Sequence, residues 1–203
     1  MKIFYASHEP LVLIKRLVEK GDRGGEINRM NSTEIALQVL DAQSGDKQAF
    51  SKLCDALYQP SFRFALKLAK QQDFAKDVTQ EAWVTVAKDI KSLREPSAFK
   101  AWLFKVVYRR FIDAVRKKTD FEPLTDELLA NTAPEQEYDL LNLINKLPDI
   151  DRHTVYLFYF EQMTMSDIAI VLGVAGGTVK SRLHRARSML AQLASDEDQE
   201  GEY

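Results

Sequence analysis

The sequence TMSDIAIVLGVAGGTVKSRLHRARSMLAQL, residues 164–193, predicts two helices that meet at a tight turn. Its apolar residues recur at helical spacing in two blocks, one before and one after Gly173. Ala169, Gly173 and Val179 stand four and six residues apart, which is the spacing of a helix-turn-helix. In that motif the alanine lets the helices approach, the glycine turns the chain at positive φ, and the valine fills the corner.

The second of these helices has a basic face opposite its apolar stripe. Lysine and arginine on such a face reach guanine edges when a recognition helix lies in the major groove. The alternative is a basic face that only meets solvent, but its coincidence with a complete helix-turn-helix pattern favours DNA. The candidate contacts to duplex DNA are Thr178, Lys180, Ser181, Arg182, His184 and Arg185.

The charge of the chain is unevenly distributed. A net charge of −2 over 203 residues would argue against nucleic-acid binding if the charges were mixed evenly. Instead, basic residues cluster in 100–118 and 180–187, whereas acidic residues collect in 120–139 and 196–202. Two basic clusters in an otherwise acidic chain indicate two contacts with nucleic acid.

Composition excludes several classes of site. Cys54 is the only cysteine, which excludes an intrachain disulfide and a CxxC metal site, and its apolar neighbours predict a small buried core residue. His8, His153 and His184 are too widely spread for a metal-ligand pattern, so no metal or cofactor is expected. No apolar run is long enough to span a membrane, and Leu11–Leu17 lacks a cleavage site, so we expect a cytoplasmic protein.

From residue 32 onward the pattern is helical almost continuously and shows no sustained period of two, which predicts an all-α protein. The first helix should bury Ile35, Leu37, Val39 and Leu40. A helix over 149–161 should support the helix-turn-helix. Helix starts are predicted at Ser32 or Thr33, Pro60, Asp73, Ser97, and at Thr164, where Asp167 completes a capping box.

The expected domain organisation is two helical domains joined by a flexible linker. Residues 121–134 contain two prolines and many acids with little periodicity, which is typical of a linker. The expected segments are an extension at 1–29 that adds nothing to function, a helical domain at 30–118, an acidic linker at 119–134, a helix-turn-helix domain at 135–195, and an acidic tail at 196–203.

The predicted helix over 98–118 interleaves basic and aromatic residues. Lys105, Arg109 and Arg116 share one face, with Tyr108 and Phe111 nearby. Cations that follow phosphates and rings that stack on bases are what binding of a single strand requires. The alternative is an amphipathic helix whose aromatics all lie in the core, and for Trp102 the core is favoured. The side chains expected to pack inward are Phe99, Trp102, Leu103, Val106, Val107 and Ala114.

Four sequence pieces together resemble one family. They are DVTQEAWVTVAKDI at 77–90, SAFKAWLFKVV at 97–107, LP at 147–148 and DIAIVLGVAGGTVKSRLHRAR at 167–187. Their order resembles regions 2 and 4 of the extracytoplasmic-function (ECF) sigma factors, the smallest class of the sigma-70 family. The resemblance covers nearly everything from Ser32 to Leu193, and GTVKSRLHRAR is its most specific part.

The resemblance implies a subunit that binds bacterial core RNA polymerase, directs it to promoter DNA and assists promoter melting, with no catalytic activity of its own. It implies docking on the β′ clamp through Asp77, Gln80 and Glu81, for which the alternative is a solvated acidic face. Region 4 would read the minus-thirty-five element. The linker would thread the polymerase channel, and an anti-sigma factor is a partner by resemblance alone. The residues implied at the minus-ten element, where a flipped base would enter a pocket near 93–97, are Leu93, Arg94, Ser97, Lys105, Tyr108, Arg109 and Arg116.

The sequence departs from the family in two places and leaves one other function open. Many relatives carry asparagine where Arg109 stands, so their minus-ten base preference does not transfer. Relatives often place serine or threonine at the position of Ala175, a cap for which Thr178 could substitute. The other function is a dimeric regulator that binds operator DNA, which would leave the 77–90 and 98–118 patterns unexplained. An enzyme is not expected, because no nucleophile or carboxylate pair stands out.

Overall fold

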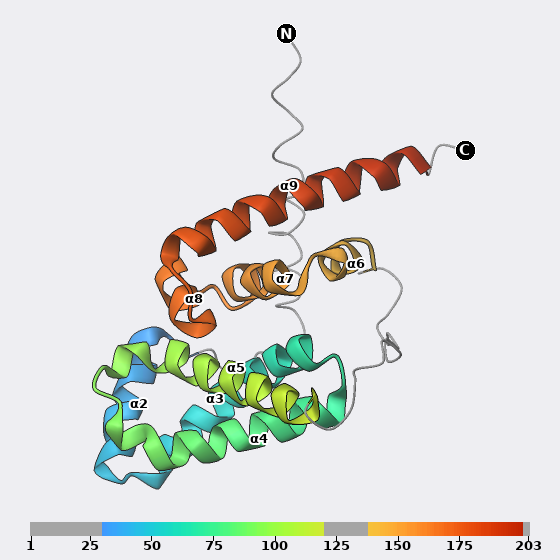
Figure 1. Cartoon of the computed structure of the whole chain (residues 1–203). Coiled ribbons are helices and arrows are strands. Elements are labelled where there is room, and N and C mark those ends of the chain that lie inside the picture. The colour runs from blue at the N-terminus through green and yellow to red at the C-terminus, as the bar shows by residue number, and fades with distance from the viewer. Residues whose placement is uncertain (1–29, 120–137, 201–203) are drawn as a thin grey trace. The chain divides into compact units, whose positions relative to one another are not determined.

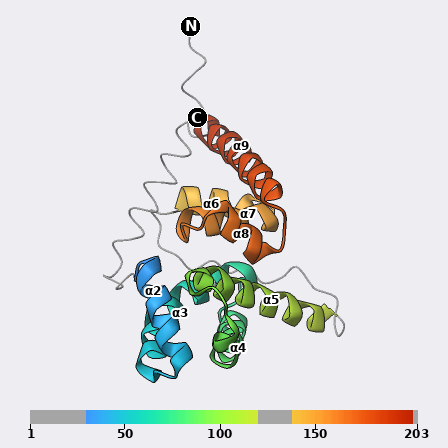
Figure 2. The same ribbon diagram turned by 90° about the vertical axis from the view of Figure 1, so that its left-hand side faces the viewer.

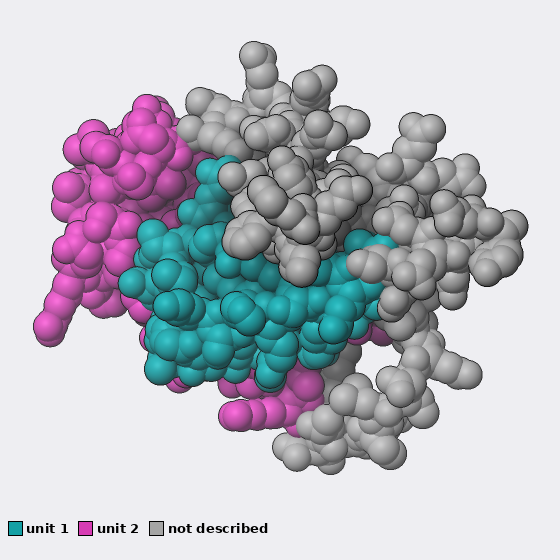
Figure 3. All heavy atoms as spheres, turned by 90° about the horizontal axis from the view of Figure 1, so that it is seen from above, with its two compact units in different colours: residues 1–26, 130–169, 174–203 teal, residues 27–129, 170–173 magenta. Residues whose placement is uncertain are grey.

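The computed structural model describes residues 30–119 and 138–200, and every element of regular structure in those ranges is helical (Figure 1). The predicted all-α fold is therefore confirmed. The described residues divide into two compact units. Residues 30–119 with 170–173, magenta in Figure 3, are the first unit along the chain, and residues 138–169 with 174–200, teal in Figure 3, are the second. Residues 170–173 include the end of a helix that starts at Met165, so this helix is treated with the second unit. The expected extension at 1–29 and nearly all of the expected linker lie outside the described residues.

The first unit is a bundle of four helices (Figures 1 and 2). They are α2 (Ser32–Ser44), α3 (Lys47–Ala69), α4 (Gln72–Asp89) and α5 (Phe99–Thr119), and the 3-10 turns η1 (Ile90–Ser92) and η2 (Pro96–Ala98) join α4 to α5. Helices α3 and α5 each contact the other three helices of the bundle. The buried Phe64 of α3 lies 5.3 Å, between ring centroids, from Phe104 of α5. The structure buries Val78, Ala82, Trp83 and Val86 of α4 and Ile90 at the start of η1.

Helix α2 differs from its prediction at both its start and its face. Asn31 caps the helix, and it exchanges capping-box hydrogen bonds of 2.9 Å with Glu34, so neither Ser32 nor Thr33 is the cap. Ile35, Val39 and Ala42 are buried at helical spacing. Leu37 and Leu40 are 54% and 51% exposed, contrary to the prediction, because they fall outside that three- to four-residue rhythm.

Helix α3 continues through Pro60, so the predicted helix start at this proline is wrong. A proline removes one backbone donor from a helix, but burial on both sides of it can hold the helix together. Leu57, Ser61 and Phe64 are all buried on the side that faces the bundle. Ser61 also accepts a 3.0 Å hydrogen bond from Trp83 Nε1, which ties α3 to α4 across the core.

Three further details of the first unit depart from the predictions. Cys54 is only half-buried, although burial together with the charge of Asp55 raises the pKa of its thiol to about 11. Gln71 precedes α4, so Asp73 lies in the first turn rather than at the start. Glu95, not Ser97, caps the turn before α5, where its carboxylate accepts from the Ser97 backbone and hydroxyl.

The buried side of α5 contains some residues other than those predicted. Phe99, Leu103 and Val107 are buried as expected. Ala101 and Phe104, which were not predicted to pack inward, are buried as well. The side chains of Trp102, Val106 and Ala114 are only half-buried.

The second unit contains four α-helices and a π-helical turn. They are α6 (Tyr138–Lys146), α7 (Asp149–Val155), the π-helical turn η3 (Tyr156–Phe160), α8 (Met165–Leu172) and α9 (Gly176–Glu200). Helix α9 packs on α6 and α7. The single helix predicted over 149–161 is wrong in its second half, because the chain widens into the π-helical turn at Tyr156. The chain then leaves through Gln162 at φ 52°.

The helix-turn-helix has the predicted local structure. Thr164 Oγ1 accepts from the Asp167 backbone at 3.1 Å and the Asp167 carboxylate accepts in return, which confirms the capping box. Gly173 has φ 65° and Val179 is fully buried, as the motif requires. Helix α9 begins at Gly176, so Thr178 lies inside its first turn and does not precede it as a cap. The helix also continues to Glu200, into the residues expected to form the tail.

Candidate nucleic-acid and protein interfaces

The predicted basic face of α9 is accessible. Lys180, Ser181, His184 and Arg185 are exposed, while Thr178 and Arg182 are half-buried. The apolar side of the same helix is held inside the unit through Val179, Leu183, Ala186 and Leu190. Anchoring of one side therefore fixes which side chains α9 presents to the surroundings, and these include the predicted set.

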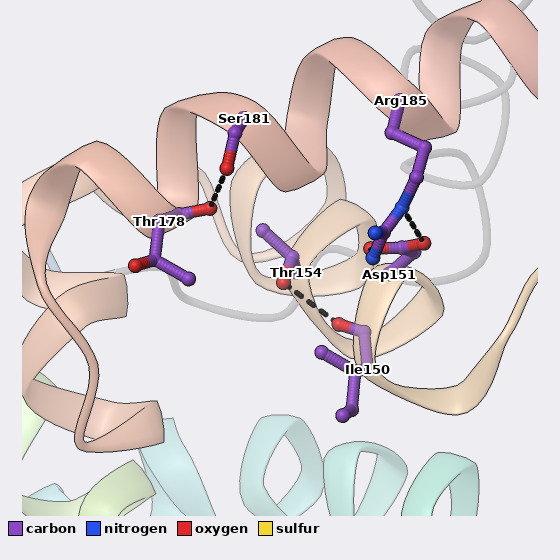
Figure 4. Close-up of polar contacts among 6 residues, drawn as sticks. All are labelled: Ile150, Asp151, Thr154, Thr178, Ser181 and Arg185. Carbon is purple, nitrogen blue, oxygen red and sulfur yellow. Dashed lines mark hydrogen bonds and ion pairs between the residues drawn. The ribbon is translucent and has the colours of Figure 1, made fainter.

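Arg185 differs from the other members of this face because it is already engaged within the unit (Figure 4). Its Nε and Nη2 atoms donate to the two carboxylate oxygens of Asp151 at 2.8 and 2.7 Å. Asp151 lies on α7 and is fully buried, whereas the Arg185 side chain is 60% exposed. The hydrogen bond and the charge of Asp151 raise the pKa of Arg185 above its ordinary value. An arginine has five N–H donors, so the pair leaves donors of this guanidinium available to an outside acceptor.

Two other polar side chains on α9 are also positioned by local contacts. Ser181 Oγ donates to the Thr178 carbonyl oxygen at 3.0 Å (Figure 4), and its lone pairs stay available to a donor such as a base amino group. Arg187, which follows the predicted set, donates to Tyr159 Oη at 2.9 Å and lies 5.8 Å from the Phe158 ring centroid. Arg187 therefore holds α9 against the π-helical turn.

The basic face of α5 is present in the first unit. Arg109 and Arg116 are exposed, and Lys105 and Tyr108 are half-buried. Trp102 is half-buried, with its ring 5.9 Å from that of Phe99, so it is neither fully core nor free of the core. The structure thus brings four of the predicted minus-ten residues onto one helix.

Arg110 faces a different direction from its neighbour Arg109. Its Nε and Nη2 atoms donate to Thr85 Oγ1 of α4 at 3.2 and 2.8 Å. One of the two adjacent arginines is thereby used to join α5 to α4, and the other is exposed. The sequence alone treated both as members of one basic cluster.

The segment 93–97 lies between α4 and α5, as predicted. Leu93 is half-buried, whereas Arg94 and Ser97 are exposed. On its inner side, Gln43 of α2 donates from Nε2 to the carbonyl oxygens of Ile90 and Leu93, both at 2.8 Å. This contact joins residues 47 and 50 positions apart, so no local sequence signal could have revealed it.

The predicted docking residues line one side of α4. Asp77, Gln80 and Glu81 are all exposed, and Val84, one turn further on, is 54% exposed. A single exposed apolar side chain is common on protein surfaces, so the acids, rather than Val84, distinguish this side of α4. A shallow hollow runs along this side, and its lining residues are Asp77, Gln80, Glu81, Val84, Thr85, Lys88 and Arg110.

The described residues contain neither a metal-binding cluster nor a membrane-spanning helix. Within residues 30–119 and 138–200, no group of three or more histidine, cysteine, aspartate or glutamate side chains is placed to hold a metal ion. None of the helices in the described part of the chain is long and apolar enough to cross a membrane.

Comparison with known proteins identifies the family. The family model for sigma-70 region 2 matches residues 53–121, and that for sigma-70 region 4 matches residues 138–190. The RNA polymerase sigma factor SigV of Bacillus subtilis is 30% identical over 145 residues, which cover 69% of this chain and 87% of SigV. The ECF RNA polymerase sigma factor SigM of Mycobacterium tuberculosis is 31% identical over 175 residues, covering 84% of this chain and 87% of SigM. The chain belongs to the ECF sigma factors of the sigma-70 family.

Solved structures agree with this membership. The sigma factor RpoE of Bartonella quintana, solved with the anti-sigma factor NepR, matches with a TM-score of 0.63 and 26% identity, over 72% of this sigma factor and 96% of that chain. CnrH, solved with the cytosolic domain of CnrY, matches with a TM-score of 0.60 and 21% identity over 80% and 98%, which supports the fold. Sigma factors are regulatory subunits rather than enzymes, and this one directs RNA polymerase to promoters.

Proposed function

We propose that the surfaces of this sigma factor divide the work of initiation among three helices. Helix α4 docks on the polymerase clamp, α5 with the segment 93–97 opens and holds the minus-ten element, and α9 reads the minus-thirty-five element. The observation that carries this proposal is that each unit buries its apolar side and leaves a face of the predicted charge exposed. A basic face on α5 and another on α9 suit two separate stretches of one promoter.

The proposed minus-ten contacts follow from the chemistry of an unpaired strand. Arg109 is exposed and Lys105 lies one turn earlier on α5, so the two can neutralise successive phosphates. The half-buried Tyr108 offers a ring beside them, and a stacked base contributes about 1–3 kcal/mol. A flipped base costs a few kcal/mol of lost stacking, which contacts in the 93–97 segment would offset.

The proposed minus-thirty-five contacts use duplex DNA. Lys180 and His184 are exposed one turn apart on α9, and Ser181 lies between them. Lysine reaches guanine O6 and N7, and serine adapts to either donor or acceptor on a base edge. Arg185 joins them through the donors that its contact with Asp151 leaves available.

The proposed polymerase contact is the acidic side of α4 together with Val84, which lies one turn further on. Asp77, Gln80 and Glu81 would pair with donors on the clamp, and Val84 would be covered by an apolar side chain. We place this subunit in the cytoplasm, where it has no catalysis of its own. We also infer control by an anti-sigma factor, since RpoE of Bartonella quintana was solved with one.

Co-purification with core polymerase tests the proposal against a dimeric operator-binding regulator. A regulator of that kind would use α8 and α9 and would leave the surfaces of α4 and α5 without a role. We expect the full chain to elute with core polymerase as a one-to-one complex. A stable dimer that never joins the polymerase would favour the regulator.

A further inference from the structure

Gln43 makes a contact in the first unit that none of the docking or DNA assignments uses. It lies half-buried near the end of α2, and its Nε2 atom donates to the carbonyl oxygens of both Ile90 and Leu93 at 2.8 Å. Carbonyl oxygens only accept, so the amide nitrogen, and not the amide oxygen, must face them. One side chain therefore joins the start of η1 to the residue that opens the 93–97 segment.

The 93–97 segment is held from outside rather than by buried side chains of its own. None of its five residues is buried: Leu93 and Pro96 are half-buried, and the other three are exposed. Its other hydrogen bonds are local. They join Glu95 to Ser97, and they join the backbone N–H groups of Leu93 and Ala98 to the carbonyl oxygens of Ile90 and Glu95. Helix α2 packs against both η1 and η2, so α2 is the rigid support on which the segment rests.

We propose that Gln43 is a positioning residue that holds the 93–97 segment in the shape that receives an unpaired minus-ten base. This inference rests on the proposed role of that segment in the minus-ten element. A pocket must be held to within a fraction of an ångström to discriminate between bases, and packing or hydrogen bonds from a second layer of residues supply that precision. Gln43 supplies two such bonds from outside the segment.

Two substitutions of Gln43 remove the bonds and keep the size of the side chain. Gln43→Met has nearly the same length and no donor, and Gln43→Glu has the same shape but presents carboxylate oxygens to two carbonyl oxygens. Gln38→Met is the matched control, because Gln38 is also half-buried on α2 but makes no such contact with the segment. Each full-length variant is assembled with core polymerase, and its thermal midpoint and assembly are measured first.

Promoter opening is then read from permanganate oxidation of unpaired thymines, on a promoter mapped with the unaltered protein. Four versions of that promoter, which differ at one minus-ten base, measure base preference. We expect both Gln43 variants to assemble normally, to open the promoter roughly tenfold less and to lose most of the base preference. Gln38→Met should behave as the unaltered protein, and a purely structural role of Gln43 would lower the thermal midpoint without changing base preference.

The outcomes separate this inference from the proposed function. Equal opening and equal base preference in Gln43→Met and the unaltered protein would overturn the role of Gln43 alone, provided that Arg94→Ala or Ser97→Ala impairs either readout. If those two variants also behave as the unaltered protein, the segment does not read the minus-ten element, and both the assignment and the inference are wrong. A lower midpoint with unchanged base preference would likewise refute positioning.

Discussion

Arg185 of α9 donates two hydrogen bonds, of 2.8 and 2.7 Å, to the carboxylate of Asp151 on α7, and Asp151 is fully buried. A carboxylate so placed needs a charged partner, because an unpaired buried charge is strongly destabilising. The same arginine lies on the exposed face proposed to enter the major groove. Its contribution to DNA binding and its contribution to the fold are therefore coupled.

Arg185→Ala should accordingly lower the thermal midpoint, whereas Lys180→Ala should not. The alanine leaves the Asp151 carboxylate buried without its partner, while Lys180 is exposed and its removal leaves no buried charge behind. Adding Asp151→Asn to Arg185→Ala removes the buried charge and should recover part of the loss. Thermal unfolding of the three variants checks this, and a double variant no more stable than Arg185→Ala would contradict the coupling.

Lys180→Ala should weaken promoter binding by roughly 1–3 kcal/mol and relax the sequence preference at the minus-thirty-five element, where Lys180 would reach a base edge. Competition between promoters mutated at single positions measures this in the assembled polymerase. Lys52→Ala, which removes an exposed lysine on α3 of the other unit, is the matched control. If Lys180→Ala discriminates between the promoters as well as the unaltered protein does, Lys180 does not contact a base in the major groove.

Glu81→Lys should impair binding to core polymerase and leave the fold unchanged. Glu81 is exposed, so the reversed charge costs little within the bundle, but it would oppose the donors expected on the clamp. Asp55→Lys, which changes another exposed acid, on α3, is the matched variant. Titration of labelled protein with core polymerase gives both affinities, and equal binding by the two variants would argue against docking through α4.

Ser61→Ala should destabilise the first unit by about 1–3 kcal/mol, because Trp83 Nε1 would lose its 3.0 Å acceptor inside the core. Denaturant unfolding, followed by tryptophan fluorescence, measures this loss in the free energy of unfolding. Ser51→Ala, an exposed position on the same helix, should change the unfolding free energy by much less. Equal effects of the two alanines would mean that the buried hydrogen bond contributes nothing.

The Cys54 thiol should react slowly with iodoacetamide at pH 8, since burial and Asp55 raise its pKa to about 11 and the thiolate is the reactive form. The same shift makes the folded protein keep this proton where the unfolded chain, with a value near 9.0, has lost it. Its contribution to stability is thus complete below pH 9.0 and is lost as the pH rises toward 11. Alkylation as fast as in the denatured protein would contradict the burial.

The sequence predicted the features that local chemistry controls. The capping box at Thr164, the turn at Gly173 and the buried Val179 depend on residues within one motif, and all three are confirmed. The family followed from motifs that are themselves local.

The features that could not be predicted from the sequence depend on residues far apart along the chain. Pro60 lies inside a helix because packing on both sides overrides its local preference. Asp151 and Gln43 act on residues 34 to 50 positions away, and neither carries a pattern of its own. An acid on the inner face of a predicted helix was the one available signal for Asp151.

Transcription from genomic DNA with purified core polymerase, with and without this chain, tests the central claim most directly. We predict that adding the protein makes RNA begin at a defined set of sites, whose upstream sequences share a minus-ten and a minus-thirty-five element. If the same start sites are used in its presence and in its absence, the chain does not direct the polymerase, and the account is wrong.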